Sequence, residues 1–215
     1  MNICIHPKLS FKPTETQLEQ LQMYVNLLLK WNNAINLIGK STQADIWDRH
    51  IWDCAQLIPY IQTQSVKQKS QKNLEVLDFG SGAGLPAVVL AILMPQAHIT
   101  ACEKVGKKCD FIKTVKIELG LQNLMVENKP VQSLLDTNKQ YNIITARAVS
   151  ELEALLKWTE GLLTPKGQYI FLKGSTASRE ISTAQDNFLD NYPMTLKRFP
   201  SIVNSSGEVL IFIKK

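Results

Sequence analysis

Apolar positions recur every three or four residues in the first part of the chain. This period begins near residue 13 and predicts an amphipathic helix that opens at Pro13 or Thr14. Two capping boxes compete for its start, Thr14 with Gln17 and Thr16 with Glu19. The Asn-rich stretch KWNNAINLIGKST that follows favours the end of the helix and a turn.

A second helical period follows, and it predicts a helix from about residue 43 to residue 60. Ser41 or Thr42 is its expected N-cap. Its apolar positions should face inward, which leaves Arg49 and His50 free for contacts outside the core. These inward positions are Ile46, Ile51, Cys54, Leu57 and Ile58. Residues 62–73 are polar and carry three lysines, which indicates a linker.

From residue 74 onward, short apolar runs alternate with helical periods. Such alternation is typical of a doubly wound α/β domain with a mostly parallel sheet. The expected strands are 74–79, 99–102, 124–127, 141–146 and 168–172, and the expected helices are 87–94, 106–119, 131–136, 151–163 and 177–189, with a turn over 164–167. Strands near 194–199 and 209–213, joined by Ser-Ser-Gly, predict a closing hairpin. We therefore expect a helical extension and linker over 1–73 and the main domain over 74–215, folded as one unit.

The first predicted strand runs into three glycines, Gly80, Gly82 and Gly84. A dinucleotide-binding loop would have its third glycine at residue 85, where this chain has Leu85. The spacing G-x-G-x-G is instead typical of loops that bind S-adenosylmethionine (SAM), which has no pyrophosphate to seat on a helix N-terminus. It predicts a Rossmann-like, SAM-dependent methyltransferase fold, with a tight strand-to-helix turn in another α/β protein as the alternative.

Glu103 strengthens this prediction, because it ends the second predicted strand, nineteen residues after Gly84. A carboxylate at this place can accept hydrogen bonds from ribose hydroxyls. Its alternative is a solvated glutamate.

Charge gives a weaker indication of the partner. The net charge is +5 and the isoelectric point is near 9.0, which favours a polyanionic partner mildly. Lys107 and Lys108 lie on the polar face of the predicted helix 106–119, beside the expected ligand crevice, although such a face is more often only solvated. Arg49 and His50 together suggest a pair that faces phosphate. For His50 the alternative is a half-buried histidine bonded to backbone.

Arg147 follows the fourth predicted strand directly. Ligands bind beyond the carboxyl ends of parallel strands, so this side chain should point into the active crevice. The alternative is an arginine that pairs a helix-terminal carbonyl or Glu151.

Other classes of site and location are disfavoured. The four cysteines show no C-x-x-C pair and no zinc-type spacing, so no metal site is expected. The longest apolar run, 87–94, is far shorter than the roughly 20 residues of a membrane span, and the N-terminus has no signal-peptide pattern. We expect a cytoplasmic protein.

The segment after the fourth strand limits the chemistry. It reads TARAVS, without the Asn or Asp followed by Pro-Pro that amino-group methylation of bases uses. No cysteine stands where methylation at a pyrimidine carbon would need a nucleophile. A ring nitrogen with a free lone pair, such as guanine N7, needs no general base, only positioning and a suitable field.

Six segments carry a resemblance to a known family: KWNNAINL (30–37), RHIWDC (49–54), VLDFGSGAGLP (76–86), GKKCDFI (106–112), ITARAV (144–149) and LKG (172–174). Over nearly its whole length the chain resembles the bacterial RsmG (GidB) family of small-subunit ribosomal RNA methyltransferases, which make N7-methylguanosine in 16S rRNA. The resemblance implies that Gly80 and Leu85 line the SAM pocket, that Glu103 holds the ribose, that Pro130 and Val131 reach the adenine through backbone, that Arg147 closes the site, and that Arg49, His50 and Lys173 lie near the RNA-facing mouth.

The chain departs from the family pattern at three places: Ala87 replaces a usual Gly, Cys54 a usual Ser, and Val131 a commonly acidic residue. The last departure leaves only a backbone role for Val131. We expect a monomer that acts on 16S rRNA or the small ribosomal subunit. A SAM-dependent methyltransferase of small molecules is the alternative enzyme, and a non-catalytic RNA-binding or assembly protein is the alternative of another class.

Overall fold

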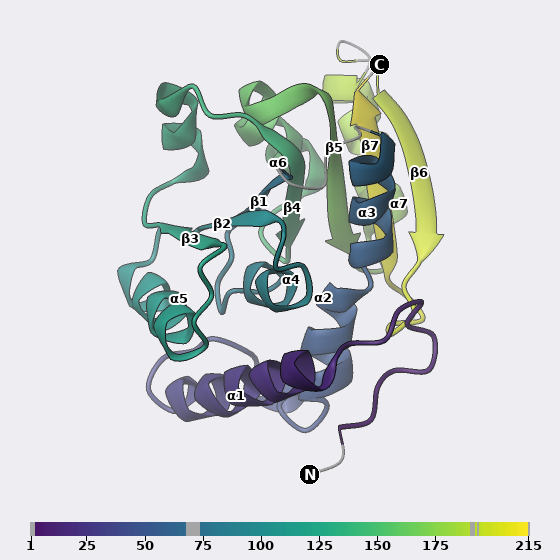
Figure 1. Ribbon diagram of the computed structural model, residues 1–215. Coiled ribbons are helices and arrows are strands. Elements are labelled where there is room, and N and C mark those ends of the chain that lie inside the picture. The colour runs from purple at the N-terminus through teal and green to yellow at the C-terminus, as the bar shows by residue number, and fades with distance from the viewer. Residues whose placement is uncertain (1–2, 68–73, 190–191, 193, 215) are drawn as a thin grey trace.

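The centre of the molecule is a mostly parallel sheet (Figure 1). The computed structural model describes residues 3–67, 74–189, 192 and 194–214. Within these residues the sheet has seven strands in the order β3-β2-β1-β4-β5-β7-β6. The strands are β1 (Glu75–Phe79), β2 (His98–Cys102), β3 (Leu124–Glu127), β4 (Tyr141–Arg147), β5 (Leu163–Lys173), β6 (Met194–Pro200) and β7 (Glu208–Lys214). Strands β1 to β5 pair in parallel, and β7 runs antiparallel to β5 and β6. The predicted doubly wound α/β fold is confirmed.

Helices cover both faces of the sheet, and β1 directs apolar side chains to each face in turn. Val76 belongs to one core cluster with the helices α1 (Glu15–Asn32), α4 (Ala87–Leu93) and α5 (Gly106–Glu118). Leu77 and Phe79 belong to a second cluster with α6 (Leu152–Thr159) and α7 (Ala177–Ala184). A strand buried on both faces explains why its sequence is almost continuously apolar.

Of the two capping boxes, the structure uses Thr14 with Gln17. The Gln17 amide donates to Thr14 Oγ1 at 3.2 Å, and the Thr14 amide donates to Gln17 Oε1 at 3.0 Å. The Gln17 side chain also donates from Nε2 to the carbonyls of Ile92 and Leu93, at 3.2 and 3.3 Å. This box therefore caps α1 and also satisfies carbonyls at the end of α4.

The predicted single helix over 43–60 is wrong. The chain forms a 3₁₀ turn (Lys40–Thr42), a π-helical segment (Trp47–Trp52), the short α2 (Asp53–Ala55) and, after a break, α3 (Ile58–Lys67). Ser41 and Thr42 lie in the 3₁₀ turn rather than at an N-cap, because the Asn32 side chain binds the amides of Leu37 and Ile38 and closes a compact loop before it. The five residues expected to face inward are buried, as predicted: Ile46, Ile51, Cys54, Leu57 and Ile58.

The linker predicted over 62–73 is wrong for residues 62–67, which continue α3, and residues 68–73 lie outside the described part of the chain. The N-terminal extension contributes Leu21 and Tyr24 to the same core cluster as Val88 and Ile112 of the main domain. The extension therefore packs as a layer on the sheet domain, and the division at residue 73 stays a prediction.

The remaining differences concern the ends of elements. The helix expected over 151–163 ends at Thr159 and continues as a 3₁₀ turn, and the short helix after β3 is a 3₁₀ helix (Val131–Thr137). The helix expected to reach 189 ends as α7 at Ala184, followed by a π-helical segment (Gln185–Leu189).

The turn expected over 164–167 lies inside β5, where the register shifts against β4: Tyr141 pairs with Leu163 and Ile143 with Gln168. The extra residues form an irregularity within the strand.

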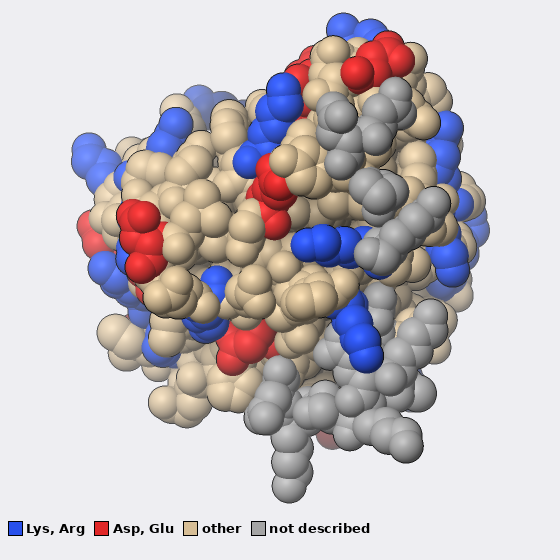
Figure 2. All heavy atoms as spheres, turned by 90° about the horizontal axis from the view of Figure 1, so that it is seen from above, with Lys and Arg blue, Asp and Glu red and all other residues tan. Residues whose placement is uncertain are grey.

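The arrowheads of β5 and β6 point toward the lower edge of the molecule in Figure 1, so the carboxyl ends of the parallel strands lie there. Figure 2 shows the opposite face, where basic and acidic side chains are interspersed among uncharged ones. No helix in the described part of the chain is long and apolar enough to cross a membrane.

Candidate functional site

Backbone hydrogen bonds join the loops at the carboxyl ends of β1, β2 and β3. The amides of Gly80 and Ser81 donate to the Cys102 carbonyl at 2.8 and 3.2 Å, and the Glu103 amide donates to the Glu127 carbonyl at 3.0 Å. The glycine loop, Glu103 and the chain after β3 therefore form one continuous edge.

Two glycines of the loop have different steric surroundings. Gly80 has φ of +65°, and a Cβ there would lie 2.5 Å from Cγ2 of Val149, so the loop passes directly beneath the segment after β4. Gly82 has φ of +56°, but a Cβ there would have only the Gly80 carbonyl oxygen, at 3.8 Å, among its neighbours. Space for a ligand thus lies beside Gly82, while Gly80 closes against protein.

Glu103 is buried, with 6% of its surface exposed. Its Oε2 accepts a hydrogen bond from the Gly82 amide and its Oε1 accepts one from the Val105 amide, both at 2.9 Å. The solvated-glutamate interpretation is therefore wrong. The carboxylate holds the glycine loop in place and keeps lone pairs for a further donor.

The chain after β3 is fastened beside Glu103. Asn128 Nδ2 donates to the Glu103 carbonyl at 3.0 Å, and the Cys102 thiol donates to the Lys129 carbonyl at 3.2 Å. Pro130 is exposed at the start of the 3₁₀ helix that follows.

Val131 and Leu85 are buried, 7% and 4% exposed, in the two core clusters. Their side chains pack inward, so any polar contact they make with a ligand must come from backbone. The Leu85 amide is already bonded to the Ser81 carbonyl at 3.0 Å.

Asp78 lies under the glycine loop and is fully buried. Its Oδ2 accepts from the Ala87 amide at 3.1 Å, whereas its Oδ1 has no hydrogen-bond partner among the described residues. The pKa of Asp78 is raised from 3.8 to about 7, chiefly by burial and in small part by the Glu103 charge, against the hydrogen bond from the Ala87 amide and the charge of Arg147. Thr145, which pairs with Asp78 from β4, has a buried hydroxyl that likewise meets no hydrogen-bond partner in the described part of the chain.

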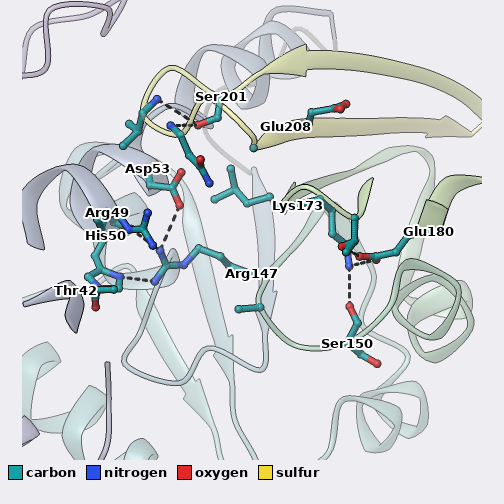
Figure 3. A pocket seen from close by; sticks show the side chains of 17 residues that line it. Thr42, Arg49, His50, Asp53, Arg147, Ser150, Lys173, Glu180, Ser201 and Glu208 are labelled. Atoms are coloured by element: carbon teal, nitrogen blue, oxygen red, sulfur yellow. Dashed lines mark hydrogen bonds and ion pairs between the residues drawn. The ribbon is translucent and has the colours of Figure 1, made fainter. Parts of the chain in front are cut away.

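A pocket of about 410 Å³ lies next to this edge, between the N-terminal extension, the ends of β4 and β5, and the β6–β7 loop (Figure 3). This volume is within the usual range for small-ligand sites. The pocket brings together four of the predicted residues, Arg49, His50, Arg147 and Lys173. Its other lining residues are Thr42, Asp53, Ala148, Ser150, Leu172, Gly174, Thr176, Glu180, Ser201, Val203, Asn204, Gly207 and Glu208.

Arg147 points into this pocket and contacts the extension (Figure 3). Its Nη1 donates to the Arg49 carbonyl at 3.0 Å and to Asp53 Oδ2 at 3.3 Å, and its Nη2 donates to His50 Nδ1 at 3.0 Å. The alternative partner Glu151 binds Arg179 instead, at 2.8 Å. Arg147 thus does bind a carbonyl, but one from the extension, 98 residues away.

His50 is buried, with 8% exposed, and its Nε2 lies 2.8 Å from Thr42 Oγ1. Burial lowers the pKa of His50 to about 4, with Arg147 and Arg49 adding to the effect. The imidazole is therefore neutral at pH 7 and bonded to side chains rather than to backbone. Of the suggested phosphate-facing pair, only Arg49 is an exposed cation.

Lys173 takes part in an internal ion pair. Its Nζ lies 2.6 Å from Glu180 Oε2 and donates to the Ser150 carbonyl at 2.7 Å, with 9% of the side chain exposed. Glu180 also accepts from the Leu152 amide and the Thr176 hydroxyl. Lys173 lines the pocket, but its charge is neutralised there.

Lys107 and Lys108 do not line the pocket. They lie in the first turn of α5, just after Glu103, where Lys107 is exposed and Lys108 half-buried. They follow Glu103 by four and five positions in the chain.

The family model described as "GidB: rRNA small subunit methyltransferase G" matches residues 17–203. The chain belongs to the GidB family. It is 35% identical over 199 residues to the ribosomal RNA small subunit methyltransferase G of Magnetococcus marinus, covering 92% of this chain and 86% of that one. The protein of the same name from Rhodospirillum centenum is 34% identical over 214 residues, covering 95% and 91%. The chain is therefore a methyltransferase.

Solved structures of the same fold differ in their acceptors. A ribosomal protein L11 methylase from Lactobacillus delbrueckii subsp. bulgaricus matches with a TM-score of 0.54 at 16% identity, over 72% of this chain and 77% of that one. A precorrin-6y C5,15-methyltransferase from Geobacter metallireducens matches with a TM-score of 0.51 at 15% identity, over 85% and 92%. These structures share the fold of this chain, and the fold by itself does not select an acceptor.

Several pocket residues of this GidB-family chain were not predicted. Asp53 stands four residues after Arg49 within RHIWDC, a spacing that puts both on one helical face and that could have indicated a role. No local sequence pattern indicated that the β6–β7 loop lines the pocket, because long-range hydrogen bonds hold it there. Gln56 Nε2 donates to Ser201 Oγ at 3.1 Å, and the Ile202 amide donates to Gln56 Oε1 at 3.0 Å.

Proposed function

We propose that this protein transfers a methyl group from SAM to N7 of a guanosine in 16S rRNA, in the cytoplasm. The observation that carries the proposal is the state of the acid–base groups around the pocket. His50 uses both ring nitrogens, Asp53 pairs with Arg147, and Glu180 pairs with Lys173. Glu208, the remaining carboxylate, pairs with Arg198. No lining group is poised to remove a proton, and guanine N7 has none to lose.

The glycine-loop edge fits the cofactor. Space lies beside Gly82, and the buried Oδ1 of Asp78 lacks a partner among the described residues. Gly80, Gly82 and Leu85 would contact SAM through backbone, Glu103 would accept from the ribose, and the backbone at 130–131 would meet the adenine. When bound, SAM supplies an electrophilic methyl group.

Arg147 connects this edge to the pocket, because Val149, two residues later, packs over Gly80. A guanine in the pocket would lie near the Arg147 guanidinium and the Asp53 carboxylate. Methylation at N7 leaves a positive charge on the purine, and a fixed carboxylate in a buried setting stabilises such a charge. Burial raises the pKa of Asp53, while the charge of Arg147 and its hydrogen bond to Asp53 oppose that effect.

Three cations are candidates for contact with the RNA backbone. Arg49 is an exposed residue of the pocket lining, and Lys107 and Lys108 lie in the first turn of α5, just after Glu103. Contacts of this kind give RNA affinity that decreases with salt.

The test is transfer of labelled methyl groups from SAM to 16S rRNA and to small ribosomal subunits, taken from cells that lack the enzyme, over a range of salt concentrations. We expect transfer to at least one of these substrates, with a KM for RNA that rises steeply with salt. SAM binding without transfer to either substrate would indicate a small-molecule acceptor, and failure to bind SAM would indicate a non-catalytic protein.

A further inference from the structure

His50 links the 3₁₀ turn of the extension to Arg147 on β4 (Figure 3). A guanidinium has donors only, so Arg147 Nη2 donates to His50 Nδ1, 3.0 Å away. Nδ1 must then be unprotonated, and in a neutral imidazole the proton is on Nε2. That N–H donates to Thr42 Oγ1 at 2.8 Å, and the Thr42 hydroxyl donates to the Gly39 carbonyl at 2.8 Å. Every donor in this chain of bonds meets an acceptor.

The charges around His50 favour the neutral ring that this arrangement requires. Arg147 and Arg49 are both close enough to oppose a charge on the ring, and the carboxylate of Asp53 is bonded to Arg147. An imidazolium would also direct its Nδ1–H at the guanidinium. The ring is buried, and its pKa of about 4 agrees with a neutral imidazole at physiological pH.

The Arg147 guanidinium is held by the extension. All three of its acceptors belong to the segment 49–53: the Arg49 carbonyl, His50 Nδ1 and Asp53 Oδ2. Its Nε–H and one Nη2–H have no hydrogen-bond partner within the part of the chain that the structure describes, and the side chain lines the pocket. The N-terminal extension therefore fixes the direction in which these remaining donors point.

We propose that His50 is a positioning residue for methyl transfer: as a neutral, Nε2-protonated imidazole it orients Arg147 toward the reacting groups. This inference rests on the proposed function, because it takes Arg147 to face cofactor or acceptor. It also gives the extension a part in the chemistry, since Thr42 accepts from Nε2 and holds the ring in place.

The tautomer is tested directly by two-bond ¹H–¹⁵N correlation spectra of the ¹⁵N-labelled full chain at pH 7, with the His50 signals assigned by their loss in His50→Asn. We expect the neutral Nε2–H form in the wild type, and in Thr42→Val the same tautomer with shifted Nε2 signals, because this N–H has lost its acceptor. An Nδ1–H form or a charged ring in the wild type would overturn the inference.

Two substitutions at His50 separate the two nitrogens. Asparagine places an oxygen near the position of Nδ1 and can still accept from Arg147, whereas glutamine places its amide near Nε2 and keeps only the Thr42 contact. We expect His50→Gln to lower kcat/KM roughly 10- to 100-fold, as for loss of a hydrogen bond to a charged group, and His50→Asn to retain most of the activity.

Thr42→Val should lower kcat/KM, as His50→Gln does. Thr42→Ser keeps the hydroxyl and should retain the activity of the wild type. The effects of Thr42→Val and His50→Gln should not add in the double variant, since both act through Arg147. His98→Gln and Thr183→Val are matched controls, because His98 is exposed on β2 and Thr183 is exposed on α7.

Melting temperatures of all variants show whether folding is affected. Equal losses in His50→Asn and His50→Gln at unchanged melting temperature would contradict the inference. A wild-type protein that transfers no methyl group to RNA would contradict the proposed function, whereas a different tautomer in an active enzyme would contradict only the role of His50.

Discussion

The amide of Gly82 donates a hydrogen bond to Oε2 of Glu103 at 2.9 Å, which ties the glycine loop to the end of β2. The other oxygen of the same carboxylate accepts from the Val105 amide. Glu103 therefore shapes the loop before any ligand binds, and we propose that it also accepts from the ribose of SAM.

Glu103→Ala should weaken SAM binding by about 1 to 3 kcal/mol, through loss of charge-assisted hydrogen bonds. Glu103→Gln keeps an oxygen for the Gly82 amide, so its loss should be smaller. Isothermal titration with SAM measures both. Unchanged affinity in Glu103→Ala would remove this residue from the cofactor site.

Lys173 provides a test of stability rather than of RNA binding. Lys173→Met leaves Glu180 as a buried carboxylate without its cation, and breaking such a pair costs about 3 to 5 kcal/mol. The double variant Lys173→Met with Glu180→Gln should recover part of this loss. Arg179→Met breaks the exposed pair with Glu151 and should have a much smaller effect. Urea unfolding measures the free energies, and an unaffected Lys173→Met would mean that the pair contributes nothing.

Lys107→Ala combined with Lys108→Ala should lower RNA affinity and reduce its dependence on salt, while SAM affinity stays the same. Lys113→Ala combined with Lys116→Ala is the matched control, because it removes the same charge from the same helix farther from the glycine loop. Binding to 16S rRNA at several salt concentrations measures both slopes. Equal slopes in the two double variants would show that the first turn of α5 has no special part in RNA binding.

Asp78 should make stability depend on pH. Its pKa in the folded protein, about 7, lies above the ordinary value of 3.8, so the native state binds the proton more tightly than the unfolded state. The free energy of unfolding should therefore fall as pH rises from about 4 to about 7 and change no further from this cause above pH 7.

Asp78→Asn has no such titration, so its stability relative to the wild type should improve over this range, by a few kcal/mol at most. Urea unfolding between pH 5 and pH 8 tests this, with Asp110→Asn on the exposed face of α5 as the control. A difference between Asp78→Asn and the wild type that is constant with pH would contradict it.

The glycine-loop edge could be predicted from sequence because local pattern determines it. A buried strand, the spacing of Gly80 to Gly84 and the position of Glu103 all follow from the order of residues along a βαβ unit. The pocket could be predicted only in part. Arg147 was found because it ends a strand.

Long-range contacts determine the rest of the site. The neutral state of His50 depends on Arg147, and the neutralised charge of Lys173 depends on Glu180. His50 lies in the π-helical segment (Trp47–Trp52). The sequence of this segment has the apolar spacing of an ordinary α-helix, so it could not be distinguished from one. The conformation of Ala148, with φ of +55°, could not be predicted from sequence either, because a non-glycine residue with positive φ is uncommon.

The most direct test of the account is the identity of the methylated base. Small ribosomal subunits from cells without the enzyme, incubated with the purified protein and methyl-labelled SAM, are digested and the nucleosides identified by mass spectrometry. We expect N7-methylguanosine at a single site in 16S rRNA. A label on any other nucleoside would contradict the proposed function. So would the absence of label from the RNA when the protein is shown to bind SAM.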